Sequence, residues 1–198
     1  MRTLFLVPII HNEHDMGSLI EKVKQEYVRQ YGPQKWEEHL KAIQGLWAGI
    51  RRTVDALNLP YGRVRLYQDG LPECGHEADI VKDVAASGSQ NHLLLLDLMK
   101  RGATLMGTED PGLLVAEYRL HKDSDPTAPD YDAKQVKEQS NSLLTQRDRH
   151  IAARINSTLL SGESGLLFLG MSHSVEPLLN DDIEIKNILS ALLMEKPQ

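Results

Sequence analysis

Short apolar runs alternate with longer amphipathic stretches along most of this chain. Residues 4–10 are almost continuously apolar, which is typical of a strand that is covered on both faces of a sheet. Further short runs occupy residues 103–107 and 166–170, and residues 63–68 alternate between apolar and polar side chains, as in a strand with one partly wet face. The segments between the runs are long enough for helices, and no short hairpin connects two strands. The pattern therefore predicts an α/β fold with a mainly parallel sheet flanked by helices.

Helical spacing predicts the elements that connect these strands. A helical hairpin is expected at about residues 16–59, inserted after the first strand, because Gly32 and Pro33 separate two helical patterns there. Residues 131–160 contain neither glycine nor proline and carry an apolar stripe, which predicts one long helix. The remaining helices are expected at about residues 78–86, 90–101, 111–120 and 183–194.

The second arm of the hairpin carries apolar residues at alternating spacings of four and three. This seam comprises Trp36, Leu40, Ile43, Trp47, Ile50, Val54 and Leu57. Such a seam packs against another helix, and Gly45 and Gly49 would permit a close approach. Two interpretations follow. Either the hairpin packs on itself, or the helix from Trp36 to Leu57 joins two chains in a homodimer.

Composition favours one folded domain over residues 1–198. The hydrophobic content of 41% and the charged content of 25% are ordinary for a globular protein. The net charge of −6 argues against a general nucleic-acid binder, and no apolar stretch approaches the ~20 residues of a transmembrane helix. We therefore expect neither nucleic acid nor a membrane as a partner. Cys74 is the only cysteine, which excludes an intrachain disulfide and favours the reducing cytoplasm.

Polar side chains follow every predicted strand. His11 and His14 come after the first strand, Asp69 after the second, Glu109 after the third and His173 after the fourth. The carboxyl ends of parallel strands meet at one edge of a sheet, where ligands bind in such folds. Imidazole and carboxylate groups ligate divalent metals or act as general acids and bases. We therefore expect a single site at this edge.

Each of these residues also has a purely structural interpretation. Asp110 precedes a proline and fits a helix N-cap, which leaves Glu109 as the better site carboxylate. Asp69 precedes a glycine and fits a turn. His11 fits a buried histidine bonded to the backbone, and His14 fits a solvated loop residue.

The long helix places positive charge beside its apolar stripe. Arg147 lies near the middle of the stripe at 100° per residue. A guanidinium keeps its charge, so a buried one needs acceptors, which carboxylates at the sheet edge would supply. Arg154 lies two turns further on the same side and is a second candidate, whereas Arg149 points to the opposite face. The alternative for Arg147 is an ordinary buried ion pair.

Taken together, these residues resemble a known group of proteins. Residues 147–155, RDRHIAARI, are followed by a predicted strand and then by residues 170–173, GMSH. This arrangement is similar to the C-terminal signature of the TraB/PrgY/GumN and Tiki family, which belongs to a wider superfamily with the erythromycin esterases and the ChaN haem-binding proteins. That group also has a histidine after its first strand, matched by His11, and acidic residues after its middle strands, matched by Glu109 and Asp69.

The chain departs from the family's pattern at three positions. Pro8 stands where the first motif commonly has glycine, and Asp148 and Ile151 replace the usual asparagine and methionine. Tiki proteins are regarded as metal-dependent proteases, erythromycin esterases as hydrolases and ChaN as a haem binder. The resemblance therefore implies a site at the strand ends and leaves its reaction open.

Two functions are consistent with these residues. In the first, the protein is a hydrolase of a small-molecule or peptide substrate. His11, Glu109 and His173 would bind a divalent metal ion or act directly as acid and base, and Arg147 would stabilise the developing oxyanion. Further substrate contacts would come from Asp69, His14 and Arg154. The alternative is a non-catalytic binding protein for haem, a metal or an anionic small molecule, with the histidines as ligands and the arginine as the anion's partner.

Overall fold

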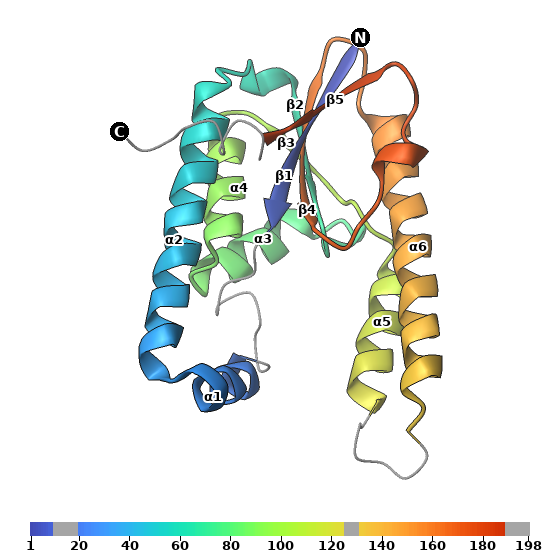
Figure 1. The fold of residues 1–198 in the computed structure, drawn as a ribbon. Helices are drawn as coiled ribbons and strands as arrows, with labels where there is room; N and C mark the ends of the chain where they lie inside the picture. Colours follow the sequence, from blue (N-terminus) through green and yellow to red (C-terminus); the bar gives the residue numbers. More distant parts are fainter. Residues whose placement is uncertain (10–19, 125–130, 189–198) are drawn as a thin grey trace.

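A parallel sheet forms the centre of the molecule. The computed structural model describes residues 1–9, 20–124 and 131–188. Within them, five strands lie in the order β3-β2-β4-β1-β5, and every neighbouring pair is parallel (Figure 1). The predicted α/β class with a mainly parallel sheet is confirmed. The strands are β1 (Arg2–Ile9), β2 (Val64–Gln68), β3 (Thr104–Met106), β4 (Ser164–Gly170) and β5 (Ile183–Asn187).

Six α-helices flank the sheet in the part of the chain that the structure describes. They are α1 (Ile20–Tyr31), α2 (Pro33–Ala56), α3 (Glu77–Ala86), α4 (Gln90–Lys100), α5 (Pro111–Asp123) and α6 (Ala133–Thr158). Each matches a helix expected from the sequence, and Gly32 and Pro33 separate α1 from α2 as predicted. Among the described residues, no helix is both long enough and apolar enough to cross a membrane.

The predicted closing helix is wrong over residues 183–187, whereas Ile188 is helical. Residues Ile183–Asn187 form the edge strand β5, which pairs with β1. Ile183 is buried and Ile185 half-buried, while Glu184 and Lys186 are exposed. This period of two suits a strand at the edge of a sheet, and the pairing with β1 outweighs the helical pattern. Residues 189–194 lie outside the described residues.

The two faces of the sheet are covered by different helices. Alternate residues of β1, such as Phe5 and Val7, pack with apolar residues of α2, α3 and α4 in one core. Leu4 and Leu6 point to the other face and pack with residues of α6 in a second core. Figure 1 shows α2 and α4 on one side of the sheet and α6 on the other. The first strand is therefore buried on both faces, as its continuous apolar sequence predicts.

Helices α1 and α2 form the predicted hairpin, but most of the seam on α2 does not face α1. Near the turn, the rings of Tyr27 and Trp36 meet edge-on with their centroids 5.4 Å apart. Ile43, Trp47, Ile50 and Val54 are buried in the core that α2 shares with the sheet and α4. The seam thus covers one face of this chain's own sheet.

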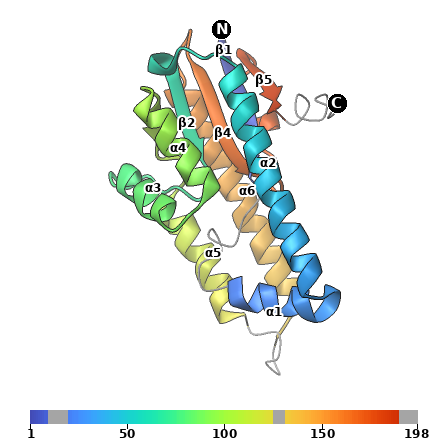
Figure 2. The ribbon, with the colours of Figure 1, turned by 90° about the vertical axis from the view of Figure 1, so that its left-hand side faces the viewer.

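The carboxyl ends of the strands open between two helical arms. In Figures 1 and 2, α1 with the adjoining part of α2, and the pair α5 and α6, extend beyond that edge of the sheet. Only the later part of α6 contributes buried residues to the sheet core, from Arg147 onward. The site residues lie where α6 passes the strand ends.

Candidate functional site

Three of the predicted site residues converge at the carboxyl ends of β2, β3 and β4. Asp69 follows β2 directly, Glu109 follows β3 and His173 follows β4. One potential metal-ligand atom from each of the three lies within 4.8 Å of those of the other two. The structure thus brings together side chains that are 40 and 64 positions apart along the chain (109 − 69 and 173 − 109).

Backbone pairing between two loops holds Glu109 in place. The amides of Thr108 and Glu109 both donate to the carbonyl of Leu71 at 3.0 Å, and the carbonyl of Glu109 accepts from the amide of Glu73 at 2.9 Å. These bonds continue the parallel pairing of β2 and β3 past the strand ends, through a bridge between Pro72 and Glu109. The Glu109 side chain is completely buried as a result.

Arg147 of α6 binds the carboxylates of the site together. Its Nε and Nη2 donate to the two oxygens of Glu109 at 2.7 and 2.6 Å, which is a bidentate pair. Nη2 also donates to Oδ1 of Asp69, and Nη1 to Oε2 of Glu117, both at 2.7 Å. Sequence analysis predicted that a buried Arg147 needs carboxylate acceptors at the sheet edge, and the structure supplies them.

His173 lies between two carboxylates. Its Nδ1 is 2.5 Å from Oδ1 of Asp148, and its Nε2 is 3.4 Å from Oδ2 of Asp69. The second oxygen of Asp148 accepts from the amide of Ser174 at 3.0 Å. These two contacts fix the orientation of the imidazole. Its side chain is 4% exposed, so water has little access to it. A histidine oriented in this way by a carboxylate at Nδ1 is a common arrangement in metal sites.

The charges in the site stabilise one another. Burial acts to raise the pKa of the Asp69 carboxyl, but the hydrogen bond and charge of His173 and the charge of Arg147 outweigh it and hold that pKa well below its usual range. Burial acts to lower the pKa of His173, but its bonds to Asp69 and Asp148 raise it above the ordinary 6.5. The pair therefore favours a protonated imidazole beside an ionised carboxylate.

A second, more exposed cluster adjoins the site on α6. Glu73, in the loop after β2, forms an ion pair with Arg154, with Oε2 3.0 Å from Nε, and its other oxygen is 2.8 Å from Nε2 of His150. Arg154 also donates to the carbonyl of Gly107 at 3.2 Å. Arg154 thus lies on the same side of α6 as Arg147, as predicted, but it is held by this loop.

The remaining predicted residues have different outcomes. His11 and His14 lie outside the described residues, so their predicted roles stay predictions. Asp110 accepts from the amide of Leu113 at 3.0 Å and caps α5, as expected for an aspartate before proline. Arg149 is exposed, also as expected.

Sequence reasoning missed two carboxylates of the site, Asp148 and Glu117. Asp148 follows Arg147 in the sequence and is equally buried, which is unusual for two adjacent charged residues of a helix. The sequence analysis noted Asp148 only as a replacement for the family's usual asparagine. Its position directly after Arg147 was the signal that could have pointed to a role in the site. Glu117 lies in the middle of α5, and nothing in its local sequence distinguishes it from a solvated helix residue.

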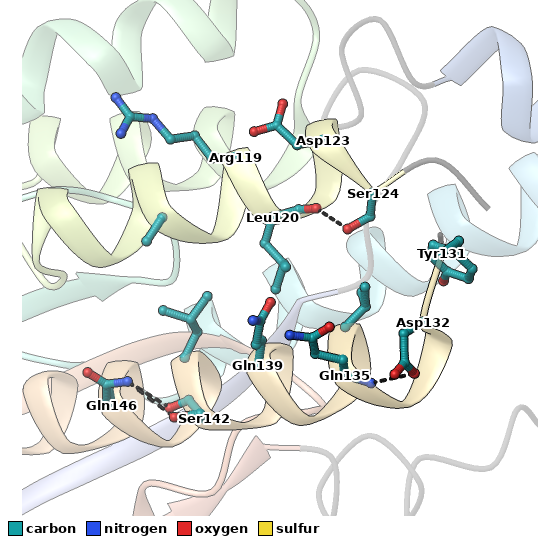
Figure 3. Close-up of a pocket in the computed structure, with 13 residues that line it drawn as sticks. Arg119, Leu120, Asp123, Ser124, Tyr131, Asp132, Gln135, Gln139, Ser142 and Gln146 are labelled. Atoms are coloured by element: carbon teal, nitrogen blue, oxygen red, sulfur yellow. Dashed lines mark hydrogen bonds between the residues drawn. The ribbon is translucent and has the colours of Figure 1, made fainter. Parts of the chain in front are cut away.

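The largest of the described cavities lies elsewhere. It measures about 660 Å³ and lies between α5 and α6 near the end of the arm (Figure 3). Leu120 of α5 and Gln139 of α6 point toward each other across it, and Asp132 caps the start of α6. None of the predicted site residues within the described ranges lines this cavity. We therefore place the site at the sheet edge, where the titratable groups converge.

Comparison with known proteins adds no assignment. No protein-family model, no curated protein and no solved structure matches this chain. The resemblance to the TraB and Tiki group therefore stays a prediction.

Proposed function

We propose that this protein is a hydrolase of a small-molecule or peptide substrate, acting at the sheet edge where Asp69, Glu109 and His173 meet. The observation that carries this proposal is the convergence of one imidazole and two carboxylates from three different strand ends. The carboxyl edge of a parallel sheet is where such folds place their ligands. An ordinary ion pair at the surface needs only two residues, so it would not explain why side chains from three strand ends meet at this edge.

The donor set fits a divalent metal ion. An imidazole nitrogen and two carboxylate oxygens suit Zn²⁺ or Mn²⁺. Asp148 binds Nδ1 of the imidazole and so orients the other nitrogen, Nε2, toward the carboxylates. Oδ1 of Asp69 and Oε2 of Glu109 each accept a single hydrogen bond from the described residues, in both cases from Arg147. Each of these oxygens therefore has a lone pair left for a metal ion. We propose that Asp69, Glu109 and His173 hold the ion, with His11 as a further ligand. A bound ion would lower the pKa of its water and polarise the substrate carbonyl.

The role that we propose for Arg147 differs from the oxyanion contact expected from the sequence. Its three nitrogens are engaged by Glu109, Asp69 and Glu117, and its side chain is 7% exposed. It is therefore better suited to hold the carboxylates close together than to meet a substrate. The same contacts disfavour the alternative of an anion-binding protein, because the guanidinium that would pair with the anion already has carboxylate partners.

Metal content and hydrolysis test the proposal together. Protein purified without chelators is expected to contain a divalent ion, and a screen of ester and peptide substrates is expected to show chelator-sensitive hydrolysis. His173→Ala is expected to lose both the ion and at least about a hundredfold of the activity, since it removes a ligand. His76→Ala is the matched control, because His76 is an exposed histidine of the same chain.

Two results would contradict the proposal. One is the absence of bound metal together with no hydrolysis in the presence of any common divalent ion. The other is hydrolytic activity that His173→Ala leaves unchanged.

We also propose a cytoplasmic location, on the basis of the single cysteine. The homodimer predicted through the Trp36–Leu57 helix stays a prediction. Because Ile43, Trp47, Ile50 and Val54 are buried in this chain's own core, such a contact would use the exposed side of α2.

A further inference from the structure

A small pocket adjoins the site on the opposite face of the sheet from α6. It measures about 230 Å³ and lies between the end of β2 and helices α3 and α4. Its lining residues are Gln68, Asp69, Gly70, Leu71, Ile80, Val84, Asn91 and His92. Gly70 is exposed and Ile80 and Val84 are half-buried, so the pocket reaches the surface. Asp69 belongs both to this pocket and to the proposed active site.

Two amide side chains that line this pocket, those of Gln68 and Asn91, form a chain of hydrogen bonds. Nε2 of Gln68 donates to the backbone carbonyl of Asp69 at 2.9 Å, and Oε1 of Gln68 accepts from Nδ2 of Asn91 at 2.9 Å. A carbonyl oxygen can only accept, so the Gln68 amide must present its nitrogen to Asp69. Gln68 then presents its oxygen to Asn91, which must present its nitrogen in return. The orientation of both amides is thereby fixed.

This arrangement leaves the oxygen of Asn91 without a donor. Asn91 is 2% exposed, and within the described part of the chain no group donates to its Oδ1. The nitrogen of the amide bonds to Gln68, so the oxygen is the end of this pocket-lining side chain that still lacks a partner. A buried acceptor without a partner typically costs about 1–3 kcal/mol. Such groups are uncommon in folded proteins, and a donor from outside the chain is one way to satisfy this one.

We propose that this pocket binds a small, neutral and mainly apolar group that carries one hydrogen-bond donor, such as a hydroxyl or an amide N–H. The donor would meet Oδ1 of Asn91, and the apolar part would contact Leu71, Ile80 and Val84. Asp69 is the one acidic residue in this lining, and its carboxylate is already paired with Arg147 and His173, so the pocket presents no unpaired carboxylate to an ion. The volume is several times the roughly 30 Å³ that one water occupies, so a larger group fits.

The shared residue Asp69 suggests what this group belongs to. The backbone of Asp69 supports the amide chain of the pocket, while its side chain takes part in the carboxylate cluster with Arg147. We assign the pocket to the part of the substrate next to the hydrolysed bond. This assignment rests on the proposed function, whereas binding to the pocket does not.

Phenol and toluene are a matched pair of probes, because they differ only in a hydroxyl in place of a methyl group. Each is titrated into the full chain while backbone amide shifts are followed by NMR. Phenol is expected to bind saturably and to shift the amides of Leu71, Ile80, Val84 and Asn91. Toluene is expected to bind about three- to tenfold more weakly, which is the effect of one hydrogen bond.

Three variants complete the test. Asn91→Leu is expected to abolish the preference for phenol, and Val84→Trp, which fills the pocket, is expected to abolish binding of both probes. Asp83→Trp adds the same side chain at an exposed position of the same helix and is expected to bind like the wild type. If Asn91→Leu does not fold, the comparison of the two probes and the two tryptophan variants still decides the result.

Equal affinity for phenol and toluene would overturn the proposal, and so would the absence of saturable shifts at these residues. Retained binding in Val84→Trp would overturn it as well. The titration involves no turnover and no added metal. A protein that binds phenol but hydrolyses nothing would therefore contradict the proposed function and leave the pocket's ligand preference standing.

Discussion

The positive charge of Arg147 explains how three carboxylates can lie close together in a buried site. Asp69, Glu109 and Glu117 would repel one another at this distance, and the guanidinium offsets that repulsion by bonding to all three. One positive charge among three negative ones leaves the cluster net negative. His173, whose pKa is raised, supplies a second positive charge next to Asp69. With Asp148 beside His173, four carboxylates face these two positive charges, so the site is net negative and would attract a cation. A metal ion held by His173 would displace the proton of the imidazole.

Removing the guanidinium should destabilise the fold strongly. Arg147→Ala would leave the fully buried Glu109 carboxylate without its counter-ion, and losing one partner of a buried pair typically costs about 3–5 kcal/mol. Urea denaturation of the variant and the wild type measures the difference in the free energy of unfolding. Arg149→Ala, at an exposed position of the same helix, should change it by less than about 0.5 kcal/mol. Similar losses in the two variants would rule out a special role for Arg147.

The carboxylate of Asp148 should set the protonation of His173. Asp148→Asn keeps the shape of the side chain but removes its negative charge, so the pKa of His173 should fall. An NMR titration of the imidazole measures the change, and loss of the signal in His173→Gln identifies the resonance. Asp181→Asn, an exposed aspartate nearby in sequence, is the control and should leave the pKa unchanged. An unshifted His173 titration in Asp148→Asn would contradict the geometry described here.

At the scale of elements, α6 connects the site to the core. Ile151 and Ile155 pack beneath the sheet, while Arg147, His150 and Arg154 lie on the side of the helix that meets the loops after β2 and β3. The close approach of those loops depends on Gly107, where an added Cβ would lie 2.8 Å from the Cα of Glu73. Packing of one helix thus fixes the position of several site residues at once.

Helix α2 offers a test of how the sheet is covered. Trp47 is 3% exposed in the core that α2 shares with the sheet and α4, so Trp47→Glu would bury a charge without a partner. We expect a loss of at least about 3 kcal/mol in the free energy of unfolding, measured by chemical denaturation. Ala48→Glu places the same charge on the exposed side of α2 and should have little effect on the folding of a single chain.

Full stability in Trp47→Glu would mean that α2 does not cover the sheet as described. Light scattering of Ala48→Glu, compared with the wild type, also reports whether the exposed side of α2 joins two chains.

The molecule as a whole consists of a sheet between two helical layers (Figure 1). The titratable groups of the proposed site gather at one edge of that sheet. The ends of β2, β3 and β4 contribute residues to this edge, and α5 and α6 contribute the groups that hold them. Folding therefore brings together groups whose ionisation depends on one another. The stability of the whole chain should reflect their titration.

The stability of the chain should be greatest in mildly acidic solution. The pKa of His173 is raised above 6.5 in the folded state, so its contribution is present below pH 6.5 and is lost as the pH rises through the folded value. The pKa of Asp69 is lowered from 3.8, so its contribution is present above that pH and is lost as the pH falls further. Urea denaturation over a range of pH should show a plateau between about pH 4 and 6.5.

The variant His173→Gln should remove the decline on the alkaline side of that plateau. Stability that rises from pH 6.5 to 9 in the wild type would contradict the direction given for His173.

Local sequence was sufficient for most of the elements and for the location of the site. Short apolar runs predicted β1, β3 and β4, alternation predicted β2, and the stripe on residues 131–160 predicted α6. Parallel pairing then followed from the helices between the strands, and it placed Asp69, Glu109 and His173 at one edge. These features depend on neighbouring residues along the chain, which is why their periodicity can be recognised without a structure.

Only the tertiary structure decided which groups hold those three residues. The contacts of Glu117 with Arg147, of Asp148 with His173 and of Asn91 with Gln68 join residues 23 to 30 positions apart. The same is true of β5, whose short alternating sequence becomes a strand because the edge of β1 is available. Such contacts depend on how helices and sheet pack in space, and no local periodicity encodes that packing.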